Sequence, residues 1–212
     1  SRDLTYQESF ILSVNNLEES PTDINLLINS FDEDIDAGTL ISPLLAIDSD
    51  NDETHTFELV NGEGDTDNDS FTIDGNQLKI NSSPDYETQS SYSIRLKTTD
   101  SGGLTYEEAV TFNVSDINEV ATDISLSSTS FNENIDAAST VATLSTTDAD
   151  ASDSHTYTLV IGTGDTDNGS FTIDGSNLKI SSSPDYETKS SFSVRLKTTD
   201  SGDLTYEEAF TL

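Results

Sequence analysis

Paired carboxylates recur at fixed places in this sequence. Asp48 and Asp50 are separated by one residue, and so are Asp85 and Glu87. On an extended segment or a bulge, side chains two positions apart project to the same side. Two unneutralised carboxylates 4 Å apart repel by about 4 kcal/mol at an effective dielectric near 20. A hard cation that takes about six to eight oxygen ligands relieves this repulsion, so the spacing favours calcium binding.

A second interpretation is that these acids are ordinary turn residues, since Asp and Asn are common in turns. That interpretation explains single acids, but the clusters occur twice. Residues 20–112 and 120–212 align without a gap and are identical at 57 of 93 positions. The same acids therefore recur in two copies, which favours a shared binding role.

The repeat also defines the expected domains. A period of 100 residues is too long for a solenoid unit and is typical of an independent β-sandwich. Residues 4–8 match residues 104–108, near the end of the first full copy. We therefore expect 1–19 to be the last strand and linker of a truncated preceding repeat, 20–119 to be one repeat, and 120–212 to be a repeat lacking its exit linker.

Short apolar segments separated by Asp, Asn, Gly and Ser clusters predict strands and no long helix. In the sixth predicted strand Tyr92, Ile94 and Leu96 alternate with polar residues, which indicates one buried and one solvated face. The strands expected in the first copy lie near 24–29, 39–47, 55–60, 71–74, 77–81, 92–98 and 104–114. Seven strands in about one hundred residues predict an all-β sandwich.

Composition excludes several classes of partner and activity. The 212 residues carry 41 acidic and 8 basic side chains, a net charge of −33, so binding to nucleic acid is excluded. No apolar run approaches the roughly 20 residues of a membrane span, so no direct membrane insertion is expected. The absence of cysteine excludes disulfides and thiolate metal sites. No catalytic motif is present, and we expect no enzyme activity.

Five acidic motifs in the first copy, of which the first four recur in the same order in the second copy, resemble the motifs of cadherin repeats over the whole length of the copy. In the first copy they are Asp32-Glu33-Asp34, Ala46-Ile47-Asp48-Ser49-Asp50, Pro84-Asp85-Tyr86-Glu87, Thr98-Thr99-Asp100-Ser101-Gly102 and Asp116-Ile117-Asn118-Glu119-Val120. The resemblance implies tandem seven-stranded Greek-key, immunoglobulin-like β-sandwiches of the cadherin type. It also implies that calcium binds between consecutive repeats.

The resemblance assigns the calcium ligands residue by residue. For the complete junction it implies Glu33, Asp85, Glu87, Asp116, Asn118, Glu119, Asp148, Asp150 and Asp200, with backbone carbonyls from Ile117 and Val120. It implies weaker half sites at Glu19, Asp48, Asp50 and Asp100 and at Glu133, Asp185 and Glu187. Glu119 and Val120 depart from the usual Asp and Asn of the family, so we expect an altered affinity at the junction.

These features predict a calcium-rigidified extender or adhesion segment of a large secreted or cell-surface protein, similar to the cadherin-like arrays of bacterial surface adhesins. The expected partners are calcium ions and neighbouring repeats of the same chain. The alternative is a calcium-dependent module that binds a glycan or a cell-surface protein. Residues 62–68 and 162–168 are interpreted as turns, with an extra ion or a sugar as the alternative. We expect His55 and His155 to be hydrogen-bonded residues at a strand start.

Overall fold

The computed structural model describes residues 1–3, 5–50 and 53–212 of the chain. These residues form two compact units, Ser1–Asp116 and Ile117–Leu212. Each unit is a sandwich of two β-sheets with a short 3₁₀ turn, η1 (Asn68–Ser70) in the first and η2 (Asn168–Ser170) in the second. The expected all-β class is confirmed. In the described part of the chain, no helix combines the length and apolar character that a membrane span needs.

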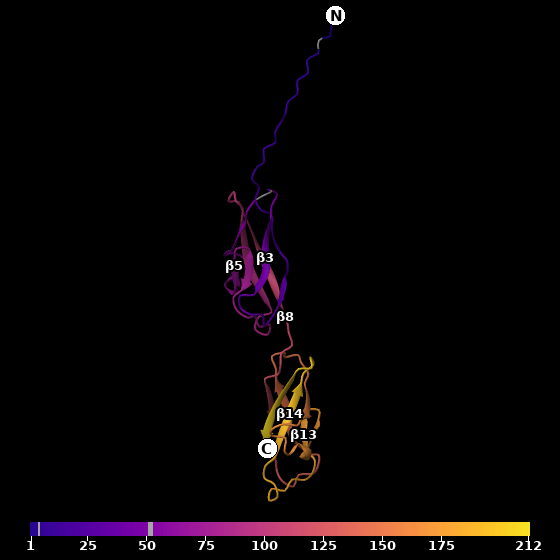
Figure 1. Ribbon diagram of the computed structural model, residues 1–212. Helices are drawn as coiled ribbons and strands as arrows, with labels where there is room; N and C mark the ends of the chain where they lie inside the picture. Colours follow the sequence, from indigo (N-terminus) through magenta and orange to yellow (C-terminus); the bar gives the residue numbers. More distant parts are fainter. Residues whose placement is uncertain (4, 51–52) are drawn as a thin grey trace. The chain divides into compact units, whose positions relative to one another are not determined.

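The first unit has eight strands within its described residues (Figure 1). One sheet has the order β1-β3-β6-β5, built from β1 (Asp23–Leu26), β3 (Leu40–Ile47), β6 (Gln77–Ile80) and β5 (Phe71–Asp74). The other has the order β2-β8-β7-β4, built from β2 (Ser30–Asp32), β8 (Thr105–Ser115), β7 (Ser91–Thr99) and β4 (Thr56–Leu59). Neighbouring strands are antiparallel except β2 and β8, which are parallel. All seven expected strands form, and β2 is an additional one.

The second unit repeats this arrangement with seven strands. One sheet has the order β12-β13-β10-β9, built from β12 (Phe171–Asp174), β13 (Asn177–Ile180), β10 (Thr140–Thr147) and β9 (Asp123–Leu126). The other has the order β11-β14-β15, built from β11 (Thr156–Leu159), β14 (Ser193–Thr199) and β15 (Thr205–Thr211). Residues 130–132, which match β2, lie outside the described strands of this unit.

The core of each unit lies between its two sheets, as the alternation in the sequence predicts. In β7, Tyr92, Ile94 and Leu96 are buried, and the residues between them are partly exposed. Phe31 and Phe71 pack edge-to-face with ring centroids 6.4 Å apart. Burying side chains of this size contributes about 1.5–3 kcal/mol each. This core fixes the loops at the two ends of the sandwich, where the acidic clusters lie.

The first twenty residues contain no strand among those that the structure describes. Tyr6, Phe10 and Leu12 are strongly exposed in this segment. The interpretation of residues 1–19 as the last strand and linker of another repeat stays a prediction.

The loops at residues 62–68 and 162–168 are held by hydrogen bonds from their own side chains to the backbone. Asp67 Oδ2 accepts a hydrogen bond of 2.7 Å from the backbone N–H of Ser93. Asn68 Oδ1 accepts one of 2.9 Å from the N–H of Arg95, and Asn68 Nδ2 donates to the Val60 carbonyl at 2.9 Å. The second unit makes the same three bonds. The Asp and Asn oxygens thus act in closing the turn, which supports the turn interpretation of these loops.

The two cores differ in the hydrogen bonding of one buried threonine hydroxyl. Thr98 and Thr198 are both fully buried. Thr198 Oγ1 lies 3.0 Å from Thr146 Oγ1, which in turn lies 2.9 Å from the hydroxyl of Tyr157. In the first unit Ala46 and Phe57 stand at the matching positions, and Thr98 Oγ1 has no hydrogen-bond partner. The second unit therefore satisfies a buried group that the first leaves unpaired.

This difference predicts a measurable loss of stability. Thr146→Ala should destabilise the second unit by about 1–2 kcal/mol, because the buried hydroxyl of Thr198 and the partly buried hydroxyl of Tyr157 lose a partner. Urea unfolding measures the change, with Thr172→Ala on the exposed side of β12 as the control for strand propensity. Equal losses in the two variants would show that the hydroxyl network contributes nothing.

Candidate metal centre

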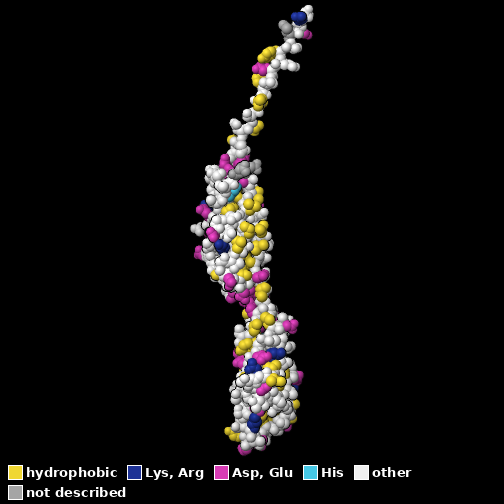
Figure 2. Space-filling view, viewed as in Figure 1, with side chains coloured by type: hydrophobic (Ala, Val, Ile, Leu, Met, Phe, Trp, Pro, Cys, Tyr) yellow, Lys and Arg dark blue, Asp and Glu magenta, His cyan; other side chains and the backbone are white. Residues whose placement is uncertain are grey.

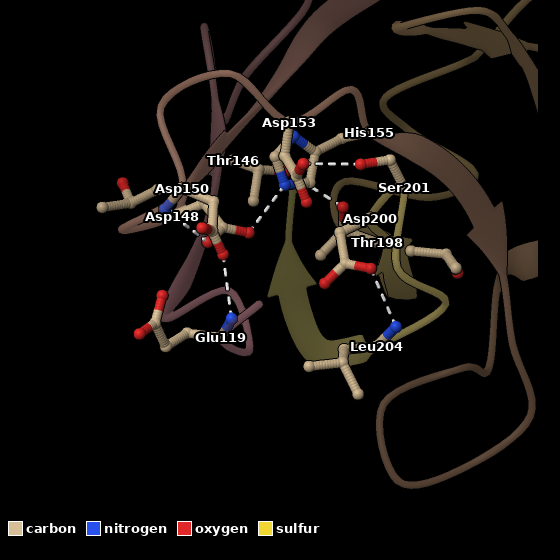
Figure 3. A network of polar contacts seen from close by, with 12 residues as sticks. Glu119, Thr146, Asp148, Asp150, Asp153, His155, Thr198, Asp200, Ser201 and Leu204 are labelled. Carbon is tan, nitrogen blue, oxygen red and sulfur yellow. Dashed lines mark hydrogen bonds and ion pairs between the residues drawn. The ribbon is translucent and has the colours of Figure 1, made fainter. Parts of the chain in front are cut away.

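We call the end of each unit at which its first strand begins the leading end. At the leading end of the second unit, the segment before β9 is hydrogen-bonded to the loops of the sandwich (Figure 3). Asp150 Oδ2 accepts a hydrogen bond of 2.8 Å from the backbone N–H of Glu119. Asn118 Nδ2 donates to Asp200 Oδ2 at 3.1 Å. A Cβ added to Gly202 would lie 2.6 Å from the Asn118 side chain, so glycine leaves the space that this side chain occupies. Four of the predicted ligands, Asn118, Glu119, Asp150 and Asp200, are therefore positioned at one end of this unit.

The leading end of the first unit is built in the same way. Asp50 accepts hydrogen bonds from Asn16 Nδ2 at 2.5 Å and from the backbone N–H of Glu19 at 2.8 Å. The backbone bond from Glu19 and the side-chain bond from Asn16 lower the pKa of Asp50. This carboxylate is thus held ionised, as a cation ligand must be.

Each unit also pairs a histidine with the first Asp of the Asp-x-Asp motif. Nε2 of His55 lies 3.2 Å from Asp48 Oδ2, and Nε2 of His155 lies 2.8 Å from Asp148 Oδ2. The side chains of the two aspartates are only 3% exposed. The backbone N–H of Asp50 and the His55 ring lower the pKa of Asp48. The prediction of hydrogen-bonded histidines is confirmed, and their contact orients the two aspartates.

Further acids at this end of the first unit crowd the same loops. Ligand atoms of Asp48, Glu53 and His55 lie within 4.8 Å of one another. A hydrogen bond with the Glu18 carboxyl, together with burial, raises the pKa of Glu53 to about 7. Asp100 is 6% exposed, and its Oδ2 has no hydrogen-bond partner. A buried carboxylate oxygen without a partner is costly unless a cation or another ligand satisfies it.

The other predicted acids lie at the end of each unit where its last strand ends, which we call the trailing end. Ligand atoms of Glu33, Asp85 and Glu87 lie within 4.8 Å of one another. Glu33 is buried, and its Oε2 accepts a hydrogen bond of 2.7 Å from the backbone N–H of Tyr86. Asp34, directly after Glu33, has a φ of 57°, so the backbone turns sharply there.

The second unit forms the same trailing cluster. Ligand atoms of Glu133, Asp185 and Glu187 lie within 4.8 Å of one another. Glu133 Oε2 accepts a hydrogen bond of 3.2 Å from the backbone N–H of Tyr186. In both trailing clusters, one glutamate, Glu33 or Glu133, lies beside two acids of the loop that follows the fifth expected strand. This agrees with the spacing in the sequence.

Not every predicted ligand is brought into a cluster within its own unit. Asp116 ends the first unit, and the side chains of Ile117 and Val120 in the second are largely exposed. Only their backbone carbonyls were assigned to calcium, and that assignment stays a prediction. The role of Asp116 as a ligand also stays a prediction.

Four residues at the leading ends were not among the predicted ligands. Glu53 and Asp153 are acids 100 positions apart, so the repeat carried a signal for them. Asp153 Oδ1 accepts a 2.5 Å bond from Ser201 Oγ, and its buried Oδ2 has no partner. Asn16 and Glu18 also carried a signal, because their matches in the other linker, Asp116 and Asn118, are predicted ligands.

Comparisons with known proteins agree with this architecture. No family model matches the chain. It is 30% identical to human protocadherin Fat 4 over 190 residues, 86% of this chain and 4% of that protein. It is 31% identical to mouse protocadherin Fat 4 over 179 residues, 82% of this chain and again 4% of that protein. The chain thus spans about one twenty-fifth of the length of these curated relatives.

Solved structures show the same fold. Human protocadherin-24 EC1-2 superposes with a TM-score of 0.62 at 20% identity, covering 91% of this chain and 95% of that one. Mouse cadherin-23 EC22-24 gives 0.61 at 20% identity, covering 86% and 61% of the two chains. The fold is that of tandem cadherin-type sandwiches, and the chain is built of cadherin-like domains. The matched proteins are named as cadherins, not as enzymes.

Proposed function

We propose that this chain is a calcium-binding, calcium-stiffened segment of a large extracellular or cell-surface adhesion protein. The proposal assigns calcium to the acidic clusters at the ends of the two sandwiches. In this proposal residues 20–119 and 120–212 are consecutive repeats, and the ligands include those assigned above to the junction. The near-identical copies and the strongly acidic, cysteine-free composition further support an array of the kind found in bacterial surface adhesins.

One observation carries the proposal: the same three acids gather at the same end of each unit. Glu33, Asp85 and Glu87 lie within 4.8 Å, and so do their matches 100 residues later. A sandwich needs no such cluster for folding, because three close carboxylates repel one another. Calcium takes carboxylate and carbonyl oxygens at about 2.3–2.6 Å, which suits this donor set better than it suits a soft metal.

The buried acids at the leading ends fit the same ion. Asp100 offers an oxygen without a hydrogen-bond partner. Asp50 and Asp150 are buried, and each is held by a backbone N–H of the segment that precedes its first strand. Such fixed carboxylates lose little conformational entropy on binding an ion. When bound, calcium supplies positive charge that offsets the repulsion among these acids.

The effect of calcium on the flexibility of the chain tests this function directly. Without calcium the acids repel, so we expect greater flexibility of the chain in EGTA than in millimolar calcium. Small-angle X-ray scattering in the two conditions measures this difference. Sodium chloride at matched ionic strength is the control for general screening. Scattering profiles that are identical with and without calcium would exclude a calcium-stiffened extender.

A further inference from the structure

The first unit has an apolar outer face that its sheet does not require. On the outside of the β1-β3-β6-β5 sheet, Leu27 is 74% exposed, Leu45 is 60% exposed and Ile47 is 41% exposed. Leu45 lies opposite Asn25 in the pairing of β1 with β3, and Pro43 lies opposite Gln77 in the pairing of β3 with β6. Figure 2 shows hydrophobic side chains gathered along one side of this unit. We call Leu27, Leu40, Pro43, Leu45 and Ile47 the apolar face.

The second unit provides a comparison within the same chain. The residues that match the apolar face are Ser127, Thr140, Thr143, Ser145 and Thr147. The pairing of β9 with β10 keeps the register of β1 with β3. The same sheet therefore folds with hydroxyl side chains on this surface. Five substitutions in one direction, on one face, in copies that are otherwise mostly identical, indicate a role outside folding.

The apolar face also has a shape and a charge that fit a protein surface. A hollow of about 240 Å³ is lined by Asn25, Leu27, Pro43, Leu44, Leu45 and Asn76. Its polar members are uncharged amides. At the far edge of the sheet, Asp74 is paired with Lys79 at 2.8 Å. Asp23 lies opposite Ile47 in the pairing of β1 with β3, so the sheet carries one exposed acid here besides the Asp74–Lys79 pair. In a chain of net charge −33, this face is therefore close to neutral.

The low charge of the apolar face indicates the kind of partner that it binds. A basic partner would be attracted to the acidic ends of the unit and would gain little from a nearly uncharged face. A second copy of this chain would be repelled by the acidic ends, but the repulsion is weaker at this face, where Asp23 is the acid nearest to Ile47. A twofold pairing places the same patch on both partners, so one apolar face is sufficient.

The exposed area is adequate for such a contact. The exposed parts of these side chains amount to an area on the order of 400 Å², within the range of the largest patch on a monomer, which is often functional. The core of an interface is about 65% apolar, so this patch corresponds to roughly 620 Å² per partner. The smaller specific interfaces bury about 600 Å² per partner. We propose that two copies of the chain associate through the apolar face of the first unit.

Sedimentation velocity over a concentration range tests this proposal. The wild-type chain should form a dimer, more completely at 500 mM than at 50 mM NaCl, because salt screens the repulsion between copies. Replacing the face by its counterpart, with Leu27→Ser, Leu45→Ser and Ile47→Thr together, should weaken dimerisation about 10-fold or more. Ile161→Ser removes a still more exposed apolar side chain, in the second unit, and should leave dimerisation unchanged. Circular dichroism verifies the folding of each variant.

Cross-linking gives a second measurement, because the chain contains no cysteine. Leu45→Cys should form a disulfide-linked dimer under mild oxidation, and Ile161→Cys should not. A chain that is monomeric at all concentrations and salt conditions would overturn the proposal and assign the face to a different partner. A dimer that survives the triple substitution would also overturn it. These outcomes do not depend on calcium binding, so they are separate from the test of the proposed function.

Discussion

Millimolar calcium is expected to raise the midpoint of thermal unfolding by about 10–20 °C for each site that is filled. Ions that bind only the folded state add RT ln(1 + [Ca²⁺]/Kd), about 2.7 kcal/mol per site at a hundredfold excess over Kd. In a domain of about one hundred residues, 1 kcal/mol corresponds to roughly 4–8 °C. The clusters of Glu33 with Asp85 and Glu87, and of the matching acids in the second unit, are the source of this effect.

Differential scanning calorimetry in EGTA and then in calcium measures the shift. Magnesium at the same concentration should give a smaller one, because it requires a tight octahedral site and keeps its water. Sodium chloride at matched ionic strength separates ion binding from screening. A transition that calcium does not move would mean that the acids are a solubilising surface and not ligands.

The second large effect is expected from Asp150→Asn. The substitution keeps an oxygen that can accept the hydrogen bond from Glu119, but it removes one negative charge. Calcium affinity should fall about 10- to 100-fold, because one of the few fixed carboxylates is lost. In EGTA the thermal midpoint should stay constant or rise slightly, since repulsion among the remaining acids decreases.

Isothermal titration calorimetry measures the affinity, and Asp174→Asn is the matched control. Asp174 is an exposed acid of β12 paired with Lys179, so its loss changes the net charge equally and should leave calcium affinity unchanged. If the two variants bind calcium alike, Asp150 is not a ligand. A large loss of stability of the Asp150 variant in EGTA would show that its role is structural.

Most strands could be predicted because their signal is local. The alternation of Tyr92, Ile94 and Leu96 with polar residues directly indicates β7, and its burial pattern follows that alternation. β2 was not predicted, because a three-residue strand has no period of its own and exists through its parallel pairing with β8, more than eighty residues later. β1 ends at Leu26, and the next backbone N–H, that of Leu27, bonds to Ser42 Oγ instead of continuing the ladder.

The acids of the candidate site were predicted for the same reason, since their spacing repeats. The segments before each first strand were harder, because the bonds from Asn16 to Asp50 and from Asn118 to Asp200 join residues far apart in sequence. The apolar face was not predicted either. Leu45 and Ile47 read as ordinary strand residues in the sequence, and only their exposure, compared with Ser145 and Thr147, distinguishes them.

The most direct test of calcium binding is a crystal structure of the chain grown in calcium, with the anomalous signal used to locate the ions. Ions should be bound by Glu33, Asp85 and Glu87 at the trailing end of the first unit, and by Asp148, Asp150 and Asp200 at the leading end of the second. Oxygen distances should be about 2.3–2.6 Å. Crystals in millimolar calcium whose carboxylates are surrounded only by water would contradict the central claim.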